Sequence, residues 1–120
     1  MDLLEIFKDF EALEVFPAGA TIIEEGVEGH LMYVVVKGEV SISIKNKVLA
    51  VAGEGEIVGE MALISSNLRS ATVTAKTDCR LAPIDQASFE SMLRHVPEFS
   101  IHVMNVLAGR LQHAYDLIER

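Results

Sequence analysis

The segment from Gly59 to Ser70 contains the residue types that could bind a small anion. It runs from a glycine and an acid through a short apolar stretch and a polar bend to an arginine and a serine. If residues 60–64 form one helical turn, their first N–H groups lack intrahelical acceptors, and the positive end of the turn favours a phosphate. Arg69 could hold two phosphate oxygens with parallel hydrogen bonds, and the Ser70 hydroxyl could donate another.

Glu60 does not fit a site for phosphate alone, because a carboxylate beside a phosphate costs electrostatic repulsion. A carboxylate accepts hydrogen bonds, however, and a ribose hydroxyl donates them. A sugar joined to the phosphate would therefore explain why Glu60 and Arg69 occur in one short segment. The alternative is a surface ion pair between the two side chains, which contributes little. Gly-Glu followed by an arginine is a weak pattern, so the spacing alone leaves both interpretations open.

The elements that must position this segment are mostly short strands. Residues 40–44 alternate apolar and polar side chains, which is typical of a half-buried strand, and Asn46 marks the hairpin that follows. Further strands are expected at residues 15–16, 21–23, 31–36, 48–52, 57–58, 71–75 and 79–84. Short strands at close spacing with glycine turns predict an antiparallel β-roll or jelly roll.

Helical spacing of apolar residues occurs near both ends of the chain. Residues 2–10 predict a short helix with Asp2 as its N-cap. From Asp85 a helix is expected to about His95, followed by a last helix with Pro97 in its first turn. This last helix carries a seam of a and d positions made of Met104, Leu107, Leu111, Ala114 and Ile118.

Length and composition predict a single folded domain. The chain has 120 residues, half of them hydrophobic, which is enough to bury one core. We expect one domain over residues 1–120, mainly β with flanking helices. Its β-roll would cover residues from about 12 to 85, and its C-terminal helices residues from about 86 to 120. A short N-terminal helix and a short helix at the anion site complete the prediction.

Charge and cysteine content limit the partners and the compartment. The net charge of −8 disfavours direct binding to nucleic acid and to anionic membranes. The single cysteine, Cys79, cannot form an intramolecular disulfide and fits a reducing compartment. The first residues lack the basic and apolar regions of a signal peptide, and no apolar run approaches the length of a membrane span. We therefore expect a cytoplasmic domain.

Other chemistry finds little support in the sequence. The four histidines are not spaced as metal ligands, and no nucleophile motif or Walker-type loop occurs. Cys79 is expected to be a buried structural thiol. A metal-dependent barrel enzyme of the cupin type would need several histidines in the strands, and only His30 precedes the final helices. We therefore expect neither a metal site nor an enzyme.

Two blocks of sequence carry a family resemblance. The first consists of Gly59-Glu60-Met61-Ala62-Leu63 followed by Arg69-Ser70-Ala71-Thr72-Val73. The second consists of Phe16-Pro17-Ala18-Gly19, Ile22, Glu25-Gly26, Gly29, Met32-Tyr33-Val34-Val35 and Gly38-Glu39-Val40. The first block resembles the phosphate-binding cassette of cyclic nucleotide-binding domains, and the second resembles the N-terminal strands and glycines of that family. The resemblance covers almost the whole chain.

The resemblance implies a role for each cassette residue. Glu60 would accept a hydrogen bond from the ribose 2′-hydroxyl, and Arg69 would pair with the cyclic phosphate. The phosphate cradle would be completed by Gly59, the backbone N–H groups of Met61, Ala62 and Ala71, and the Ser70 hydroxyl. Four apolar residues would line the sugar and base pocket, although such side chains are more often core: Leu49, Val58, Leu63 and Val73.

The last helix corresponds to the lid and coupling element of the family. Arg110 falls where several relatives carry an arginine that meets the nucleotide or the cassette glutamate, and its alternative is a solvated helix arginine. Ala114 and Tyr115 stand where some relatives have Thr and Ser hydroxyls that contact adenine. Purine hydrogen bonding from this helix is therefore in doubt. Tyr115 could stack on the base instead, but packing is the more common role of such a residue.

The function implied by the resemblance is a sensor that binds a 3′,5′-cyclic nucleotide as its ligand, needs no cofactor and performs no chemistry. We expect cAMP, with cGMP as the alternative, because a hydroxyl such as Ser70 occurs after the cassette arginine in binders of both. The partner would be a second copy paired through the last helix, or a separate effector protein. A different interpretation is a regulatory or interaction module of a transcription factor or channel that no longer binds nucleotide.

Overall fold

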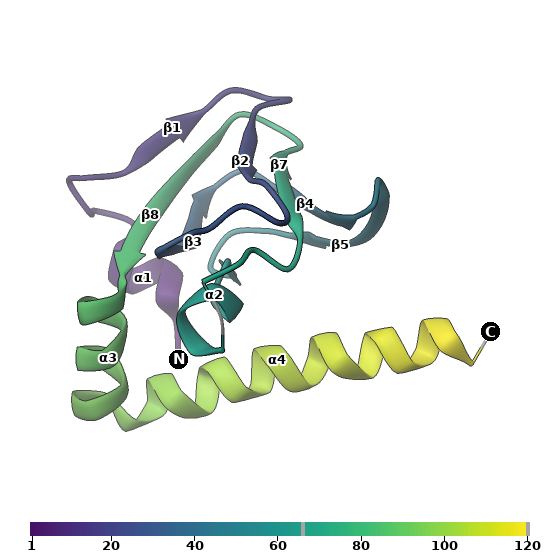
Figure 1. Ribbon diagram of the computed structural model, residues 1–120. Coiled ribbons are helices and arrows are strands. Elements are labelled where there is room, and N and C mark those ends of the chain that lie inside the picture. Colours follow the sequence, from purple (N-terminus) through teal and green to yellow (C-terminus); the bar gives the residue numbers. More distant parts are fainter. Residues whose placement is uncertain (66, 120) are drawn as a thin grey trace. The chain divides into compact units, whose positions relative to one another are not determined.

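The computed structural model describes residues 1–65 and 67–119, which contain four helices and eight strands (Figure 1). Ser66, in the predicted polar bend, and Arg120 lie outside the described residues. The elements are α1 (Leu3–Phe7), β1 (Glu14–Phe16), β2 (Thr21–Ile23), β3 (Leu31–Lys37), β4 (Val40–Ile44), β5 (Lys47–Ala52), β6 (Ile57–Val58), α2 (Met61–Ile64), β7 (Thr72–Ala75), β8 (Cys79–Asp85), α3 (Gln86–His95) and α4 (Pro97–Ile118).

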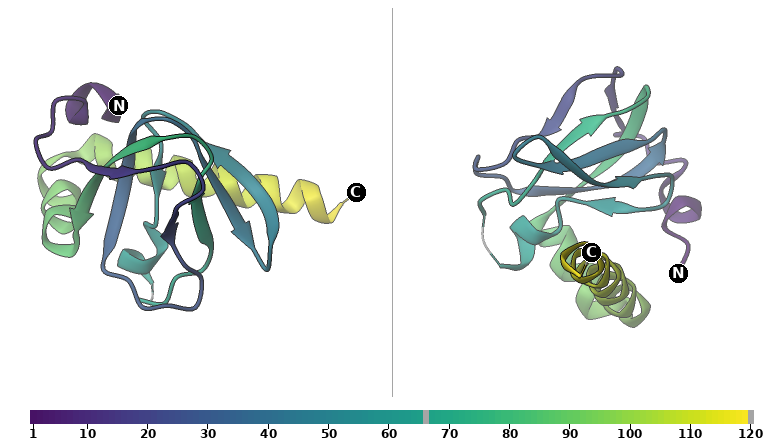
Figure 2. Two further views of the ribbon diagram at one scale, coloured as in Figure 1. Left: turned by 90° about the horizontal axis from the view of Figure 1, so that it is seen from above. Right: turned by 90° about the vertical axis from the view of Figure 1, so that its right-hand side faces the viewer.

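The strands form two antiparallel four-stranded sheets, which the two views of Figure 2 show from different sides. One sheet has the order β1-β8-β3-β6 and the other the order β2-β7-β4-β5. Neighbouring strands are mostly far apart in sequence, as in the pairing of Val34 with Ala82 and of Ile42 with Val73. This arrangement confirms the predicted fold class, an antiparallel β-roll with flanking helices.

Local signals in the sequence set the ends of several elements as predicted. The Asp2 carboxylate accepts a hydrogen bond of 3.1 Å from the N–H group of Glu5 and caps α1. The β4–β5 hairpin turns on Lys45 and Asn46, which have φ angles of 50° and 67°. Positive φ at both central residues is the signature of a two-residue hairpin turn that matches the strand twist. Pro97 begins α4, where its missing N–H group costs nothing.

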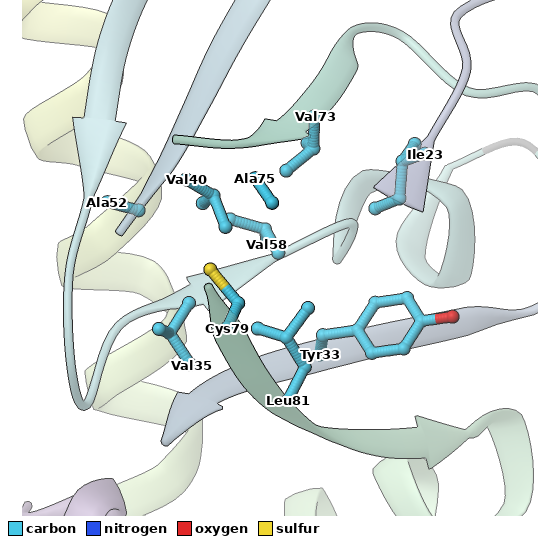
Figure 3. Close-up of a cluster of buried hydrophobic side chains, with 10 residues drawn as sticks. All are labelled: Ile23, Tyr33, Val35, Val40, Ala52, Val58, Val73, Ala75, Cys79 and Leu81. Carbon is cyan, nitrogen blue, oxygen red and sulfur yellow. The ribbon is translucent and has the colours of Figure 1, made fainter. Parts of the chain in front are cut away.

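The core of the roll lies between the two sheets (Figure 3). Side chains from both sheets contribute to one buried cluster of Ile23, Tyr33, Val35, Val40, Ala52, Val58, Val73, Ala75, Cys79 and Leu81. Cys79 is 1% exposed, and its sulfur lies 3.2 Å from the carbonyl oxygen of Glu39 and 3.1 Å from that of Thr77. The prediction of a buried structural thiol is confirmed.

The chain divides into two compact units, which we describe separately. One unit spans Asp2–Gln86 and contains every described strand together with α1 and α2. The other unit contains α4 and α3 from Ala87 onward, where the rings of Phe89 and Phe99 meet edge to face at 5.8 Å between their centroids. No helix among the described residues combines the length and the apolar character needed to cross a membrane.

Candidate functional site

The candidate site begins where β6 ends and the chain turns at Gly59. Gly59 has a φ angle of 81°, which favours glycine, and a Cβ atom there would lie 2.8 Å from Cδ1 of Ile23 and 3.2 Å from the carbonyl oxygen of Leu31. The short helix α2 then covers Met61–Ile64, with Glu60 as its N-terminal flanking residue. The predicted helical turn is confirmed, and its glycine is required by both backbone conformation and space.

Glu60 is the one buried charged side chain among the described residues, at 2% exposure. A carboxylate in such a position is screened little by solvent, so its charge acts strongly on neighbouring groups. Burial lowers the pKa of Arg69, and the negative charge of Glu60 partly opposes this change and so favours the charged guanidinium. A buried carboxylate does not fit the alternative of a surface ion pair, and it leaves the polar recognition role as the better interpretation.

Arg69 is half-buried and bonds to the backbone on which the cassette begins. Its Nη1 atom donates a hydrogen bond of 3.1 Å to the carbonyl oxygen of Gly59. Burial lowers the pKa of Arg69, while Tyr33 and Glu60 oppose this change. An arginine remains a cation at neutral pH under these conditions, and its guanidinium carries five N–H donors. One bond to Gly59 therefore leaves donors that can hold an anion.

The loop between β2 and β3 fixes the backbone around Arg69. The N–H group of Arg69 donates to the carbonyl oxygen of Val27 at 2.9 Å, and the N–H group of Gly26 donates to the carbonyl oxygen of Arg69 at 2.9 Å. The N–H group of Gly29 donates to the carbonyl oxygen of Asn67 at 2.7 Å. In the left view of Figure 2 the β2–β3 loop and the segment before β7 run along the same end of the roll. The sequence did not predict these hydrogen bonds between the loop and residues 67–69, because glycines between short strands indicate only turns.

Thr72, at the start of β7, is a second residue that the sequence analysis did not assign to the site. Its Oγ1 atom accepts a hydrogen bond of 3.1 Å from the N–H group of Glu25 and donates one of 3.2 Å to the Glu25 carboxylate. The same carboxylate accepts a hydrogen bond of 3.0 Å from the N–H group of Lys45. These bonds anchor the strand that directly follows Ser70 and Ala71. The sequence around Thr72 contains no signal that its side chain would bond to Glu25.

The remaining cassette residues differ in exposure. Ser70 is exposed and Ala71 is partly buried, and both follow Arg69 directly. At the other end of the segment, Met61 is 40% exposed and Ala62 is 3% exposed, in the first turn of α2. The structure thus brings Gly59 and Glu60 together with Arg69 through the bond to the Gly59 carbonyl. The cradle that Met61, Ala62, Ser70 and Ala71 would complete around a phosphate stays a prediction.

The four apolar residues expected to line the pocket lie in or near the core. Val58 and Val73 belong to the buried cluster between the sheets (Figure 3), at 1% and 3% exposure. Leu63 is 7% exposed and Leu49 is half-buried. The burial of Val58 and Val73 matches the alternative that these residues are core. A role for any of the four in contacting a ligand stays a prediction.

The two lid residues belong to α4, in the other compact unit. Arg110 is partly buried, and Tyr115 is 51% exposed. Their approach to the cassette stays a prediction.

The chain belongs to the cyclic nucleotide-binding domain family, because residues 13–96 match that family and this range covers most of the chain. The cAMP-activated global transcriptional regulator CRP of Salmonella typhimurium is 30% identical to it over 115 residues. That alignment covers 91% of this chain and 55% of the relative. The chain therefore spans about half the length of the curated relatives it matches.

Two solved structures support the fold. The c-di-GMP responsive global regulator CLP of Xanthomonas campestris superposes with a TM-score of 0.83 and 26% identity, over 98% of this chain and 62% of that one. The EAL enzyme Bd1971 in its cAMP-bound form superposes with a TM-score of 0.64 and 34% identity, over 89% of this chain and 30% of that one. The family resemblance inferred from the sequence is confirmed, and the relatives include regulators and part of one enzyme.

Proposed function

We propose that this chain is a regulatory domain that binds a 3′,5′-cyclic nucleotide, with cAMP as its preferred ligand. The observation that carries the proposal is that a buried carboxylate, Glu60, directly follows the residue whose carbonyl oxygen accepts a hydrogen bond of 3.1 Å from the Arg69 guanidinium. One group accepts hydrogen bonds and the other donates them, as a ribose hydroxyl joined to a phosphate requires.

In the proposed complex Arg69 binds the cyclic phosphate and Glu60 accepts a hydrogen bond from the ribose 2′-hydroxyl. The backbone N–H groups of Met61, Ala62 and Ala71, together with the Ser70 hydroxyl, supply the other donors to the phosphate. All of these are recognition roles. The proposal therefore assigns ligand binding to the domain and no bond-making or bond-breaking step.

The choice of cAMP rests on the relatives and is the part of the proposal that binding data decide most directly. The Salmonella relative is named as cAMP-activated, whereas the Xanthomonas regulator is described as responsive to c-di-GMP. Ser70 is compatible with cAMP and with cGMP. We propose cAMP first, with cGMP as the alternative.

We further propose that α4 passes the signal to a partner. Five exposed apolar side chains of this helix share one face, at spacings of three, four and seven residues: Ile101, Met104, Leu111, Tyr115 and Ile118. Ligand binding can change the balance between two arrangements of α4 only to the extent that the ligand binds one arrangement more tightly than the other. A second copy is the preferred partner, and a separate effector protein is the alternative. If the helices pair, Leu111→Glu should convert a dimer to a monomer in sedimentation, and an unchanged dimer would exclude this interface.

Calorimetry with four ligands tests the main proposal. The purified chain is titrated with cAMP, cGMP, AMP and c-di-GMP, and the titrations are repeated with Arg69→Ala. A charge-assisted hydrogen bond contributes at least about 1.5 kcal/mol, so Arg69→Ala should weaken cyclic nucleotide binding at least about tenfold. Arg80→Ala, which removes an exposed arginine of β8, is the matched control and should leave the affinity unchanged.

The four titrations separate the possible ligands and the different class of function. Heat with cGMP or c-di-GMP in place of cAMP would reassign the ligand. Absence of binding to either cyclic mononucleotide would refute the proposed function and favour an interaction module. An Arg69→Ala variant that binds as tightly as the unmodified chain would refute the phosphate role of Arg69.

A further inference from the structure

Position 29 is a glycine although its backbone conformation does not demand one. Five other glycines have φ angles between 81° and 93°, a region that side chains rarely adopt, whereas Gly29 is not among them. Gly29 is also buried. A reason other than backbone conformation must therefore exclude a side chain from this position.

That reason is the side chain of Arg69. A Cβ atom at position 29 would collide with Nε of Arg69, and it would lie 2.5 Å from Cζ and 2.8 Å from Cδ of the same residue. These three atoms are the nearest to such a Cβ, and all of them belong to the arginine. The guanidinium and the end of its aliphatic stem thus pack directly on the bare Cα atom of Gly29.

Gly59 provides the second bare position against which the guanidinium lies. A Cβ atom there would be 3.0 Å from Nη1 of Arg69, the atom that donates to the Gly59 carbonyl oxygen at 3.1 Å. Two glycines from different parts of the chain therefore define the space that the guanidinium occupies. A side chain at either position would crowd the guanidinium.

The backbone cannot move away to make room for a side chain at position 29 without losing hydrogen bonds. Three of them, of 2.7 to 2.9 Å, join Gly26, Val27 and Gly29 to Asn67 and Arg69. An isolated bridge between Glu28 and Leu68 lies within the same pair of segments. A methyl group at position 29 must therefore displace the arginine side chain.

We propose that Gly29 is a positioning residue for Arg69: the absence of a side chain at position 29 holds the guanidinium at the Gly59 carbonyl, where its remaining donors can bind the phosphate. The consequence for ligand affinity rests on the proposed function. The steric part of the proposal does not, because the packing of Arg69 on Gly29 exists in the chain without ligand.

A double-mutant cycle tests the proposal with the full chain. The four proteins are the unmodified chain, Gly29→Ala, Arg69→Ala and the double variant. Each is titrated with cAMP by calorimetry and unfolded with urea in the absence of ligand. Gly53→Ala is the matched control, since Gly53 also lies outside the positive-φ region and a Cβ atom there would be 3.8 Å from the nearest atom, Oε1 of Glu56.

We expect Gly29→Ala to weaken cAMP binding about tenfold or more, the loss that follows when one charge-assisted hydrogen bond is misplaced. In the Arg69→Ala background the same substitution should change the affinity less than about twofold, because the effect acts only through Arg69. Gly29→Ala should also lower the urea midpoint when Arg69 is present and not when it is absent. Gly53→Ala should leave the affinity unchanged.

Three outcomes would overturn the proposal. The first is a folded Gly29→Ala variant that binds cAMP as tightly as the unmodified chain. The second is an equal loss of affinity or stability in both backgrounds, which a purely structural role predicts. The third is that neither Gly29→Ala nor the double variant folds. If the steric argument is right, removing the Arg69 side chain should restore folding. If the unmodified chain binds no cyclic nucleotide, the proposed function fails, and the urea cycle still decides the positioning role.

Discussion

Glu60→Gln tests sugar recognition more sharply than any other substitution in the site. The change keeps the size of the side chain and removes its negative charge. Glu60 is 2% exposed, so solvent does little to weaken the interaction of the carboxylate with a hydroxyl group. In the proposed complex this carboxylate accepts a hydrogen bond from the ribose 2′-hydroxyl, and a glutamine oxygen can accept only a neutral one.

The expected loss follows from the difference between the two kinds of hydrogen bond. A bond to a charged group contributes about 1.5–3 kcal/mol, and a neutral one about 0.5–1.5 kcal/mol. Their difference of about 1–1.5 kcal/mol corresponds to a loss of about 5- to 13-fold in the affinity for cAMP. A ligand without the 2′-hydroxyl cannot make either bond, so its affinity should not distinguish the two proteins.

The assay is calorimetric titration of both proteins with cAMP and with 2′-deoxy-cAMP. The unmodified chain should prefer cAMP over 2′-deoxy-cAMP, and this preference should be about 5- to 13-fold smaller in Glu60→Gln. The affinity for 2′-deoxy-cAMP should be equal in both proteins. Glu11→Gln, the same change at an exposed position, is the control and should alter neither affinity. A Glu60→Gln variant that loses the same factor for both ligands would refute the role of Glu60 in sugar recognition.

Two further predictions concern the roll itself. Burial raises the pKa of Tyr33, so the folded protein keeps the phenol proton that the unfolded chain releases near pH 10. Stability from this group is therefore complete below about pH 10 and falls above it by at most about 1.4 kcal/mol per pH unit. Urea unfolding of Tyr33→Phe should show a smaller alkaline fall than the unmodified chain, and identical falls would contradict the argument. Val34→Ala, in a fully buried position of β3, should lower the free energy of unfolding by about 1.5–3 kcal/mol. Val48→Ala, at 64% exposure in β5, should change it by less than about 0.5 kcal/mol, and similar losses at the two positions would refute the placement of the core.

Features that depend on a few neighbouring residues could be predicted from the sequence. Asp2 caps α1, Asn46 lies in the β4–β5 turn and Pro97 begins α4, as local conformational preferences require. Glu60 and Arg69 could be singled out because they have opposite hydrogen-bonding chemistry within one short segment, and the family resemblance supplied the other cassette residues. The family was indicated by a resemblance carried by two blocks of residues, the cassette at residues 59–73 and the strands and glycines at residues 16–40.

The tertiary structure decided the properties that depend on segments far apart in the chain. The burial of Glu60 excludes a surface ion pair, and the packing of Val58 and Val73 between the sheets places them in the core. The strand orders β1-β8-β3-β6 and β2-β7-β4-β5 join segments whose hydrophobic patterns do not indicate which strands pair with one another.

The two glycines of the β2–β3 loop show this division most clearly. Both suggested a turn, because glycine is the usual residue where φ is positive. Gly26 has a φ angle of 81° and fits that reason, whereas Gly29 lies outside the positive-φ region and packs under the side chain of Arg69. Backbone conformation is a local property that a sequence pattern can predict. The space that a distant arginine occupies exists only once the two segments have been brought together by the fold.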